Sequence, residues 1–183
     1  MKLVFLLEEP SMKVLLDVLL PKIIPNIDFE TIPHEGKSDL QKSIPRTLKI
    51  RNDPNVKFVV VHDQDSHDCK KLKQRLLDLC KDTNKQVLVR IVCKELESWY
   101  FGDLNAVSTA YDSPNLMKLR NKSKYRVVDN IHNAKLELRK HVSNYNAISG
   151  ARKIAPHMDI DNNTSSSFGF FVTGVKRIAE LTK

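Results

Sequence analysis

The sequence lacks paired cysteine motifs, long hydrophobic runs and internal repeats. Its three cysteines, Cys69, Cys80 and Cys93, show no C-x-x-C spacing, which argues against a disulfide framework or a zinc site. The longest nearly apolar run, residues 14–24, is interrupted by charge and proline and is far shorter than the roughly 20 residues of a membrane span. Residues 1–7 also lack the features of a signal peptide. We therefore expect a soluble, cytoplasmic protein with no membrane partner.

The composition is that of a globular protein with a basic surface. Hydrophobic residues make up 41% of the 183 residues and charged residues 28%, close to globular averages. The formal net charge is +8. Such a balance favours an acidic partner such as nucleic acid, although charge alone fits a merely soluble basic surface equally well.

Segments typical of strands alternate with segments typical of helices over the first part of the chain. Residues 11–20, after the first strand, have the apolar spacing of a helix that ends near Pro21, and Pro45 is expected to kink or restart the second helix. Strands are expected at 2–7, 26–33, 56–62 and 86–93, and helical segments at 11–20, 37–50, 69–82 and 95–111. Parallel strands need crossovers, so this order predicts an α/β fold whose parallel sheet has helices on both faces.

The rest of the chain is expected to form a mostly helical C-terminal extension. We expect a single domain over residues 1–183, with a core of about 1–103 and an extension of about 104–183. The apolar stripe of residues 165–181 predicts a helix that docks on the sheet. Basic residues occupy every second position of residues 117–126, which in a strand would share one face: Lys118, Arg120, Lys122, Lys124 and Arg126.

Acidic residues follow the expected strands, where ligands bind in parallel α/β sheets. They are Glu8 and Glu9 after the first strand, Asp63 and Asp65 after the third, and Glu95 and Glu97 after the fourth. Carboxylates are ligands of hard divalent cations, and Mg²⁺ is usually held by one or two of them. The alternative is that the aspartates cap the following helix through Ser66 and Asp68. Glu8 favours the metal site, because capping does not explain it.

The stretches "LLEEPS" and "VVVHDQDS" resemble the TOPRIM fold, a metal-binding domain of topoisomerases, primases and overcoming-lysogenization-defect type nucleases. That pattern has a glutamate after the first strand and a D-x-D after the third. The sequence is also similar to a family of bacterial TOPRIM-like proteins of unknown function, often encoded beside an ABC-type ATPase in defence islands. "HEGKSDL", "ELESWY" and "ISGARKIAPHMDID" carry this likeness, which covers nearly the whole chain.

The resemblance implies a divalent-metal-dependent nuclease or nickase, with DNA favoured over RNA as substrate. Glu8, Asp63 and Asp65 would hold Mg²⁺ or Mn²⁺ and, with Glu97, carry out catalysis. It further implies an antiviral defence effector controlled by a partner ABC-type ATPase. The alternative is a non-catalytic TOPRIM-like module that docks on such an ATPase or on nucleic acid.

Several further residues have both a functional and a structural interpretation. Glu97 could add a metal ligand or, equally, cap the next helix. Lys37, at a glycine-containing loop that enters a helix, could meet a phosphate, although a solvated loop lysine is the commoner case. Arg152 and Lys153 could stabilise charge on a phosphoryl group or be ordinary surface charge. We also expect nucleic-acid contacts from Lys118, Arg120, Lys122 and Lys124.

Overall fold

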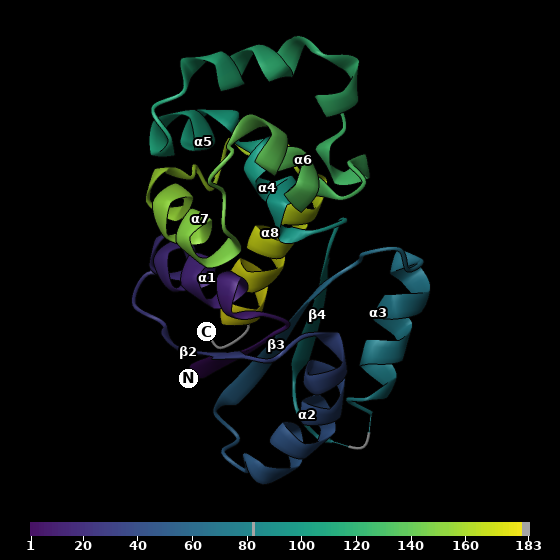
Figure 1. Cartoon of the computed structure of the whole chain (residues 1–183). Helices are drawn as coiled ribbons and strands as arrows, with labels where there is room; N and C mark the ends of the chain where they lie inside the picture. The colour runs from purple at the N-terminus through teal and green to yellow at the C-terminus, as the bar shows by residue number, and fades with distance from the viewer. Residues whose placement is uncertain (82, 181–183) are drawn as a thin grey trace.

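A computed structural model of the chain describes residues 1–81 and 83–180. Its centre is a four-stranded sheet in the order β2-β1-β3-β4 in which every neighbouring pair is parallel (Figure 1). The strands are β1 (Lys2–Leu7), β2 (Asp28–Pro33), β3 (Val56–Asp63) and β4 (Val87–Val92). This sheet, with helices on both faces, confirms the predicted α/β fold.

The register of β1 against β3 decides which residues meet at the carboxyl edge of the sheet. Leu7, the last residue of β1, pairs with Val61 of β3. Glu8 therefore leaves its strand beside the final two residues of β3, His62 and Asp63. The two acidic segments become neighbours because their strands are adjacent and parallel.

The strands alternate between two hydrophobic cores, one on each face of the sheet. Leu3 and Phe5 of β1 face the larger core, and Val4 and Leu6 face the smaller one. Helices α2 (Lys37–Ile50) and α3 (Cys69–Asp78) cover the smaller core. Helix α1 (Pro10–Ile23) covers the other face together with the C-terminal helices (Figure 1). Because β1 and β3 are buried on both faces, their sequences are almost continuously apolar.

The chain after β4 is helical, as expected. Its α-helices are α4 (Leu96–Gly102), α5 (Leu104–Ala110), α6 (Ala134–His141), α7 (Ala147–Ile154) and α8 (Ser166–Glu180). Short 3₁₀ helices lie between them: η1 (Pro114–Asn121), η2 (Ser123–Tyr125), η3 (Val128–Asn130) and η4 (Ala155–His157). Helix α7 packs on α1 and α8 packs on β4, so the extension shares the larger core.

Three sequence-based details differ in the structure. Residues 117–126 form 3₁₀ turns rather than a strand, because Leu116, Leu119 and Tyr125 are buried at spacings of three and six, which suit a helix of three residues per turn. Helices α1 and α2 continue through Pro21 and Pro45. The last residues of two predicted helices, 82 and 181, lie outside the described residues.

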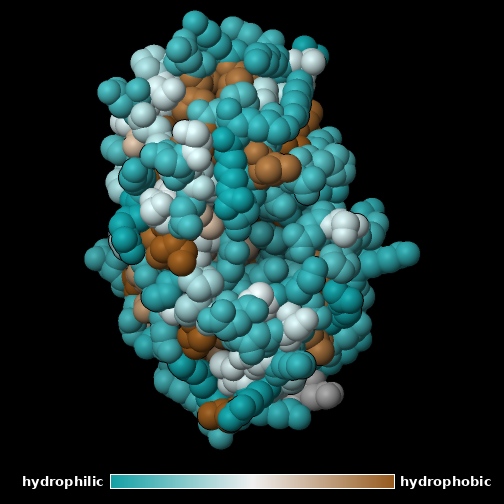
Figure 2. Space-filling view, in the orientation of Figure 1, coloured by the Kyte–Doolittle hydropathy of each residue, from teal (hydrophilic) through white to brown (hydrophobic). Residues whose placement is uncertain are grey.

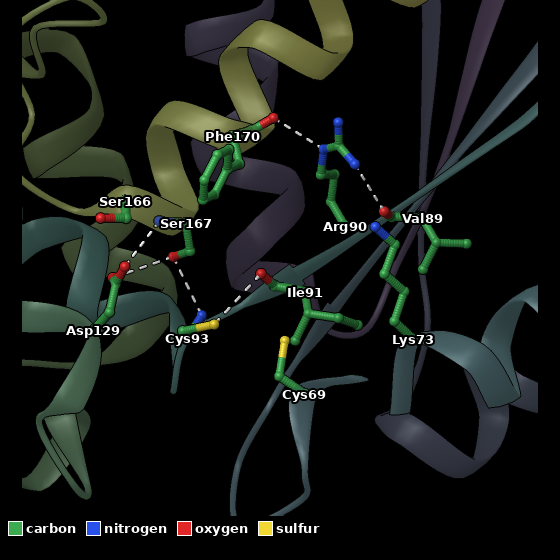
Figure 3. A pocket seen from close by; sticks show the side chains of 10 residues that line it. All are labelled: Cys69, Lys73, Val89, Arg90, Ile91, Cys93, Asp129, Ser166, Ser167 and Phe170. Atoms are coloured by element: carbon green, nitrogen blue, oxygen red, sulfur yellow. Dashed lines mark hydrogen bonds between the residues drawn. The ribbon is translucent and has the colours of Figure 1, made fainter. Parts of the chain in front are cut away.

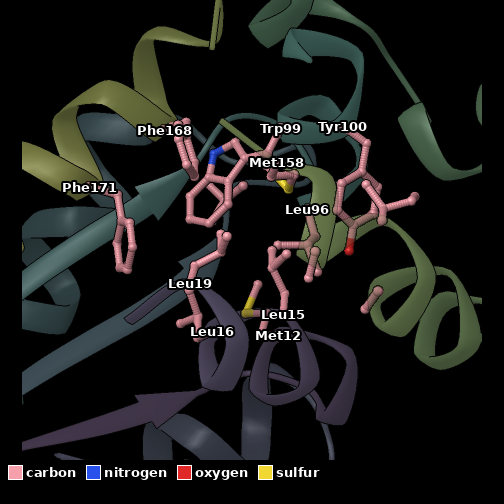
Figure 4. Packing of buried hydrophobic residues seen from close by; sticks show 14 of the residues in the cluster. Met12, Leu15, Leu16, Leu19, Leu96, Trp99, Tyr100, Met158, Phe168 and Phe171 are labelled. Atoms are coloured by element: carbon pink, nitrogen blue, oxygen red, sulfur yellow. The ribbon is translucent and has the colours of Figure 1, made fainter. Parts of the chain in front are cut away.

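Aromatic side chains from α4 and α8 form the centre of the larger core (Figure 4). Trp99 is 1% exposed, and its ring centroid lies 5.1 Å from that of Phe168 and 5.2 Å from that of Phe171. The indole Nε1 donates a hydrogen bond to Ser167 Oγ at 2.9 Å. The ring packing and the hydrogen bond together fix α8 against α4.

The molecular face in Figure 2 is mainly hydrophilic, with separate small hydrophobic patches. Exposed large apolar side chains are few among the described residues, and Phe170 is the most exposed aromatic one, at 69%. None of the helices in the described part of the chain combines the length and the apolar character needed to cross a membrane.

Replacing Phe171 tests the aromatic core. Phe171→Ala should lower the free energy of unfolding by about 3–5 kcal/mol, because the fully buried ring leaves a cavity against Trp99. Chemical unfolding followed by the fluorescence of Trp99, the only tryptophan, measures this loss. The matched control Phe170→Ala removes an exposed ring and should change stability by no more than about 0.5 kcal/mol. Equal losses in both variants would contradict this account of the core.

Candidate functional site

Glu8 and Asp63 meet at the carboxyl edge of the sheet. The backbone N–H of Asp63 donates to Glu8 Oε2 at 2.9 Å, and this hydrogen bond is buried. The two residues are 9% and 8% exposed. The contact confirms the expected proximity of the first-strand glutamate to the D-x-D segment, and it fixes one oxygen of Glu8 against the end of β3.

His62 contacts both residues of this pair. Its fully buried ring has Nδ1 at 2.8 Å from Glu8 Oε2 and at 2.6 Å from the carbonyl oxygen of Asp63. Both partners are acceptors, so Nδ1 carries the proton, and Nε2 accepts from the Gln41 amide nitrogen at 3.0 Å. The ring thereby orients the Glu8 carboxylate from inside the smaller core.

The Asp63 carboxyl group is buried among other acids. Its Oδ1 has no hydrogen-bond partner among the described residues. Burial raises the pKa of Asp63 well above its ordinary value, and the negative charges of Glu8, Glu9, Glu97 and Asp65 raise it further. A buried, unpaired carboxylate oxygen costs about 1–3 kcal/mol or more, so this site is unfavourable for folding.

Glu97 belongs to the same acidic cluster, and Glu95 does not. Glu97 lies in the first turn of α4, is 2% exposed, and accepts a hydrogen bond from the Tyr145 hydroxyl at 2.7 Å. Burial raises the pKa of Glu97, and the Tyr145 hydrogen bond opposes that rise. Glu95 instead accepts from the backbone N–H of Lys135 at the start of α6.

Asp65 lies at the outer side of the cluster in a left-handed backbone conformation, with φ of 51°. Its N–H donates to the carbonyl oxygen of Lys94 at 2.9 Å, which ties the turn to the end of β4. Its carboxylate lies 3.3 Å from Lys37 Nζ. Both side chains of this ion pair are partly exposed, so the pair contributes little to stability.

The loop between β2 and α2 brings Lys37 to this edge. The N–H of His34 donates to the carbonyl oxygen of Leu7 at 3.0 Å, and that of Gly36 donates to the carbonyl oxygen of Glu8 at 2.9 Å. Gly36 has φ of 96°, a conformation that non-glycine residues rarely adopt. "HEGK" is therefore a turn fixed to the end of β1, and Lys37 begins the helix that follows it.

The helix-capping interpretation applies to Asp68 rather than to Asp63 or Asp65. Asp68 accepts from the backbone N–H of Lys71 at the start of α3.

A hollow of about 230 Å³ lies against Asp65, and its other walls come from Ser66, Lys94, Glu95, His132 and Asn133. The sequence did not identify Lys94 or His132 as site residues. Only the folding of the extension brings the segment with His132 to this edge.

In the described part of the chain, none of the remaining predicted basic residues forms an ion pair with the acids of the cluster. Lys118, Arg120 and Lys122 are exposed on the 3₁₀ turns, and Lys124 pairs with Glu137 at 2.7 Å. Arg152 and Lys153 are exposed on α7. Lys153 lies over the Tyr111 ring and lines a separate hollow beside His141.

Figure 3 shows a larger hollow, of about 450 Å³, between α3, β4 and α8. Several of its polar groups are already paired. Asp129 accepts from the backbone N–H of Ser167, and Arg90 donates to the carbonyl oxygens of Val89 and Phe170. None of the acids of the cluster lines this hollow. We therefore place the candidate chemistry at Glu8 and Asp63 rather than in this hollow.

The donor chemistry of the cluster fits a hard divalent cation. Asp63 Oδ1 is an unpartnered buried oxygen, and the acids that raise the Asp63 pKa surround it with negative charge that an ion would offset. In residues 1–81 and 83–180, no three Asp, Glu, His or Cys side chains already stand at the spacing of a metal site.

These features define a parallel α/β protein with a buried acidic cluster at the carboxyl edge of its sheet. The chain belongs to the family described as domain of unknown function DUF4276, which it matches over residues 7–176. No curated protein and no solved structure matches it significantly. The matched region contains both the acidic cluster and nearly all of the helical extension.

Replacing Asp63 tests the burial of its charge. The pKa of Asp63 is higher in the folded chain than in the unfolded chain. Such an acid makes the folded protein less stable as the pH rises above the unfolded pKa. Asp63→Asn should therefore raise the melting temperature at pH 8, by about 2–4 °C for each kcal/mol recovered. The gain should shrink towards pH 4, and calorimetry at both pH values measures it.

Asp68→Asn is the matched control, because Asp68 is exposed and its pKa is lowered by the backbone N–H of Lys71. It should give no gain at pH 8. Millimolar Mg²⁺ should raise the melting temperature of the wild type by mass action and leave Asp63→Asn unchanged. A melting temperature of Asp63→Asn below that of the wild type at pH 8 would contradict this account of Asp63.

Proposed function

We propose that this chain is a divalent-metal-dependent nuclease or nickase that cuts nucleic-acid phosphodiesters. The observation that carries the proposal is the buried carboxyl group of Asp63, whose Oδ1 has no hydrogen-bond partner among the described residues, beside Glu8 at the carboxyl ends of adjacent parallel strands. Structural acids of this kind are normally paired, and a strongly raised pKa in such a position is characteristic of functional sites.

In this proposal Glu8 and Asp63 hold Mg²⁺ or Mn²⁺, with Asp65 at the outer side. A bound ion of this kind supplies positive charge that stabilises the negative charge developing on a phosphodiester. His62 keeps the Glu8 carboxylate oriented from the core. Lys37 exchanges its exposed contact with Asp65 for a substrate phosphate.

The basic surface of the extension is proposed to bind the nucleic-acid backbone. Lys118, Arg120 and Lys122 have no acidic partner among the ion pairs of the described residues, unlike Lys124. Unpaired surface cations attract phosphates and release counterions when they bind them. DNA is the preferred substrate in this proposal. The net charge of +8 supports the same partner class.

The biological part of the proposal is a cytoplasmic, antiviral defence effector that a partner ABC-type ATPase controls. Its support is the similarity of "HEGKSDL" and "ELESWY" to TOPRIM-like proteins encoded beside such ATPases. A second candidate is a non-catalytic module that docks on the ATPase or on nucleic acid. The observation that favours it is the lack of a preformed three-residue metal group in the described chain.

Replacing Glu8 separates the two candidates. Glu8→Gln keeps the shape of the side chain and removes one negative charge, so it should reduce cleavage by about 100-fold or more while folding is retained. The assay uses plasmid and single-stranded DNA with Mg²⁺ or Mn²⁺, with and without the co-purified ATPase. Glu35→Gln, in the exposed loop before Gly36, is the matched control and should cleave normally. Equal cleavage by wild type and Glu8→Gln would leave the docking module as the better candidate.

The salt dependence of DNA binding tests the basic surface. Replacing Lys118 and Lys122 together with glutamine should weaken binding to all sequences alike and reduce the slope of log Kd against log salt by about 2. Replacing the exposed Lys42 and Lys49 of α2 removes the same charge from another surface and should leave the slope nearly unchanged. Equal slopes for both double variants would assign DNA binding to net charge rather than to the extension.

A further inference from the structure

The C-terminal extension reaches the acidic cluster through Tyr145. This residue lies in the loop between α6 and α7, is 4% exposed, and donates its hydroxyl hydrogen to Glu97 Oε1 at 2.7 Å. The two residues are 48 positions apart, and their hydrogen bond is buried. A side chain of the extension therefore contacts a carboxylate at the edge of the sheet directly.

The position of the Tyr145 ring is fixed by its surroundings. Its backbone N–H donates to the carbonyl oxygen of Val142 at 3.0 Å. The ring lies against Gly150 of α7, where a Cβ atom would come within 2.3 Å of Tyr145 Cε2. Glycine is required there by this close approach. Because the ring is held between its loop and α7, its hydroxyl has a defined position opposite Glu97.

Glu97 accepts its hydrogen bond from an uncharged group, the Tyr145 hydroxyl, although charged groups surround it. A tyrosine hydroxyl orients a carboxylate without cancelling its negative charge, whereas a closely paired lysine or arginine would offset the charge that attracts a cation. The other groups that act electrostatically on Glu97 are Lys135 of α6, Glu9 just before α1, Asp63 of β3 and Tyr100 of α4. The buried Tyr100 hydroxyl has no hydrogen-bond partner among the described residues.

We propose that Tyr145 is a positioning residue that holds Glu97 in the acidic cluster, so that Glu97 acts with Glu8 and Asp63 on a bound divalent cation. The inference rests on the metal site of the proposed function and extends that site into the C-terminal extension. Tyr145 acts through Glu97 and has no contact with the ion in this scheme. The extension is then part of the functional site as well as a cover for the larger core.

The test is a Mn²⁺ titration of the full-length chain, with free Mn²⁺ measured by electron paramagnetic resonance. Tyr145→Phe removes only the hydroxyl and should weaken Mn²⁺ binding by about 10-fold, the usual effect of removing a partner that orients a metal ligand. Glu97→Gln should weaken it at least as much. The double variant should bind Mn²⁺ no more weakly than Glu97→Gln alone, because Tyr145 acts through that carboxylate.

Tyr125→Phe is a closely matched control. The Tyr125 hydroxyl also donates to a buried glutamate, Glu137, at 2.7 Å, and Glu137 is not among the charges that raise the Asp63 pKa. This variant should lower the melting temperature much as Tyr145→Phe does and leave Mn²⁺ affinity unchanged. Trp99 fluorescence verifies that each variant is folded. A loss of affinity confined to Tyr145→Phe therefore reports the site rather than general stability.

Three results would overturn the positioning role. They are a wild type that binds no Mn²⁺, a Tyr145→Phe variant with wild-type affinity, and a further loss on adding Tyr145→Phe to Glu97→Gln. A wild type that binds Mn²⁺ without cleaving DNA contradicts the proposed nuclease activity alone. In that case a 10-fold loss in Tyr145→Phe still supports the role of Tyr145.

Discussion

The adjacency of β1 and β3 is the constraint on which the candidate site depends. Glu8 directly follows β1 and Asp63 ends β3, and parallel pairing brings both to one edge of the sheet. The hydrogen bond from the Asp63 N–H to Glu8 then fixes the two residues within the same buried space. If β2 or β4 lay between these strands, the carboxylates would be separated by about 5 Å more and the site would not form.

The energy for holding these acids together comes from the two cores. Asp63 is buried without a partner for Oδ1, and Asp65 has a left-handed backbone, so both residues oppose folding. Apolar packing on both faces of β1 and β3 more than offsets these costs in the folded chain. Unfavourable local arrangements of this kind persist at functional sites, where binding of a ligand relieves them.

The local sequence was a good guide to the elements and to their acidic ends. Continuous β-branched runs predicted buried parallel strands, and apolar spacing predicted the helices, because both patterns reflect which side of each element is buried. The same reasoning was wrong for residues 117–126. Alternating charge there suggested a strand, but the burial of Leu116, Leu119 and Tyr125 decided the backbone conformation. The positions of exposed charges place little constraint on a backbone, whereas buried apolar side chains constrain it strongly.

The sequence by itself determined the α/β class and the acids at the strand ends, since these follow from local periodicity, whereas the strand order that puts Glu8 beside Asp63 was decided by tertiary pairing. Only the tertiary structure decided which acids are buried and what holds them. It separated Glu97, which accepts from Tyr145, from Glu95, which caps α6. It also brought His62 beneath Glu8. Such contacts join segments far apart in the chain, and their geometry depends on how whole helices pack, which no local pattern of residues records.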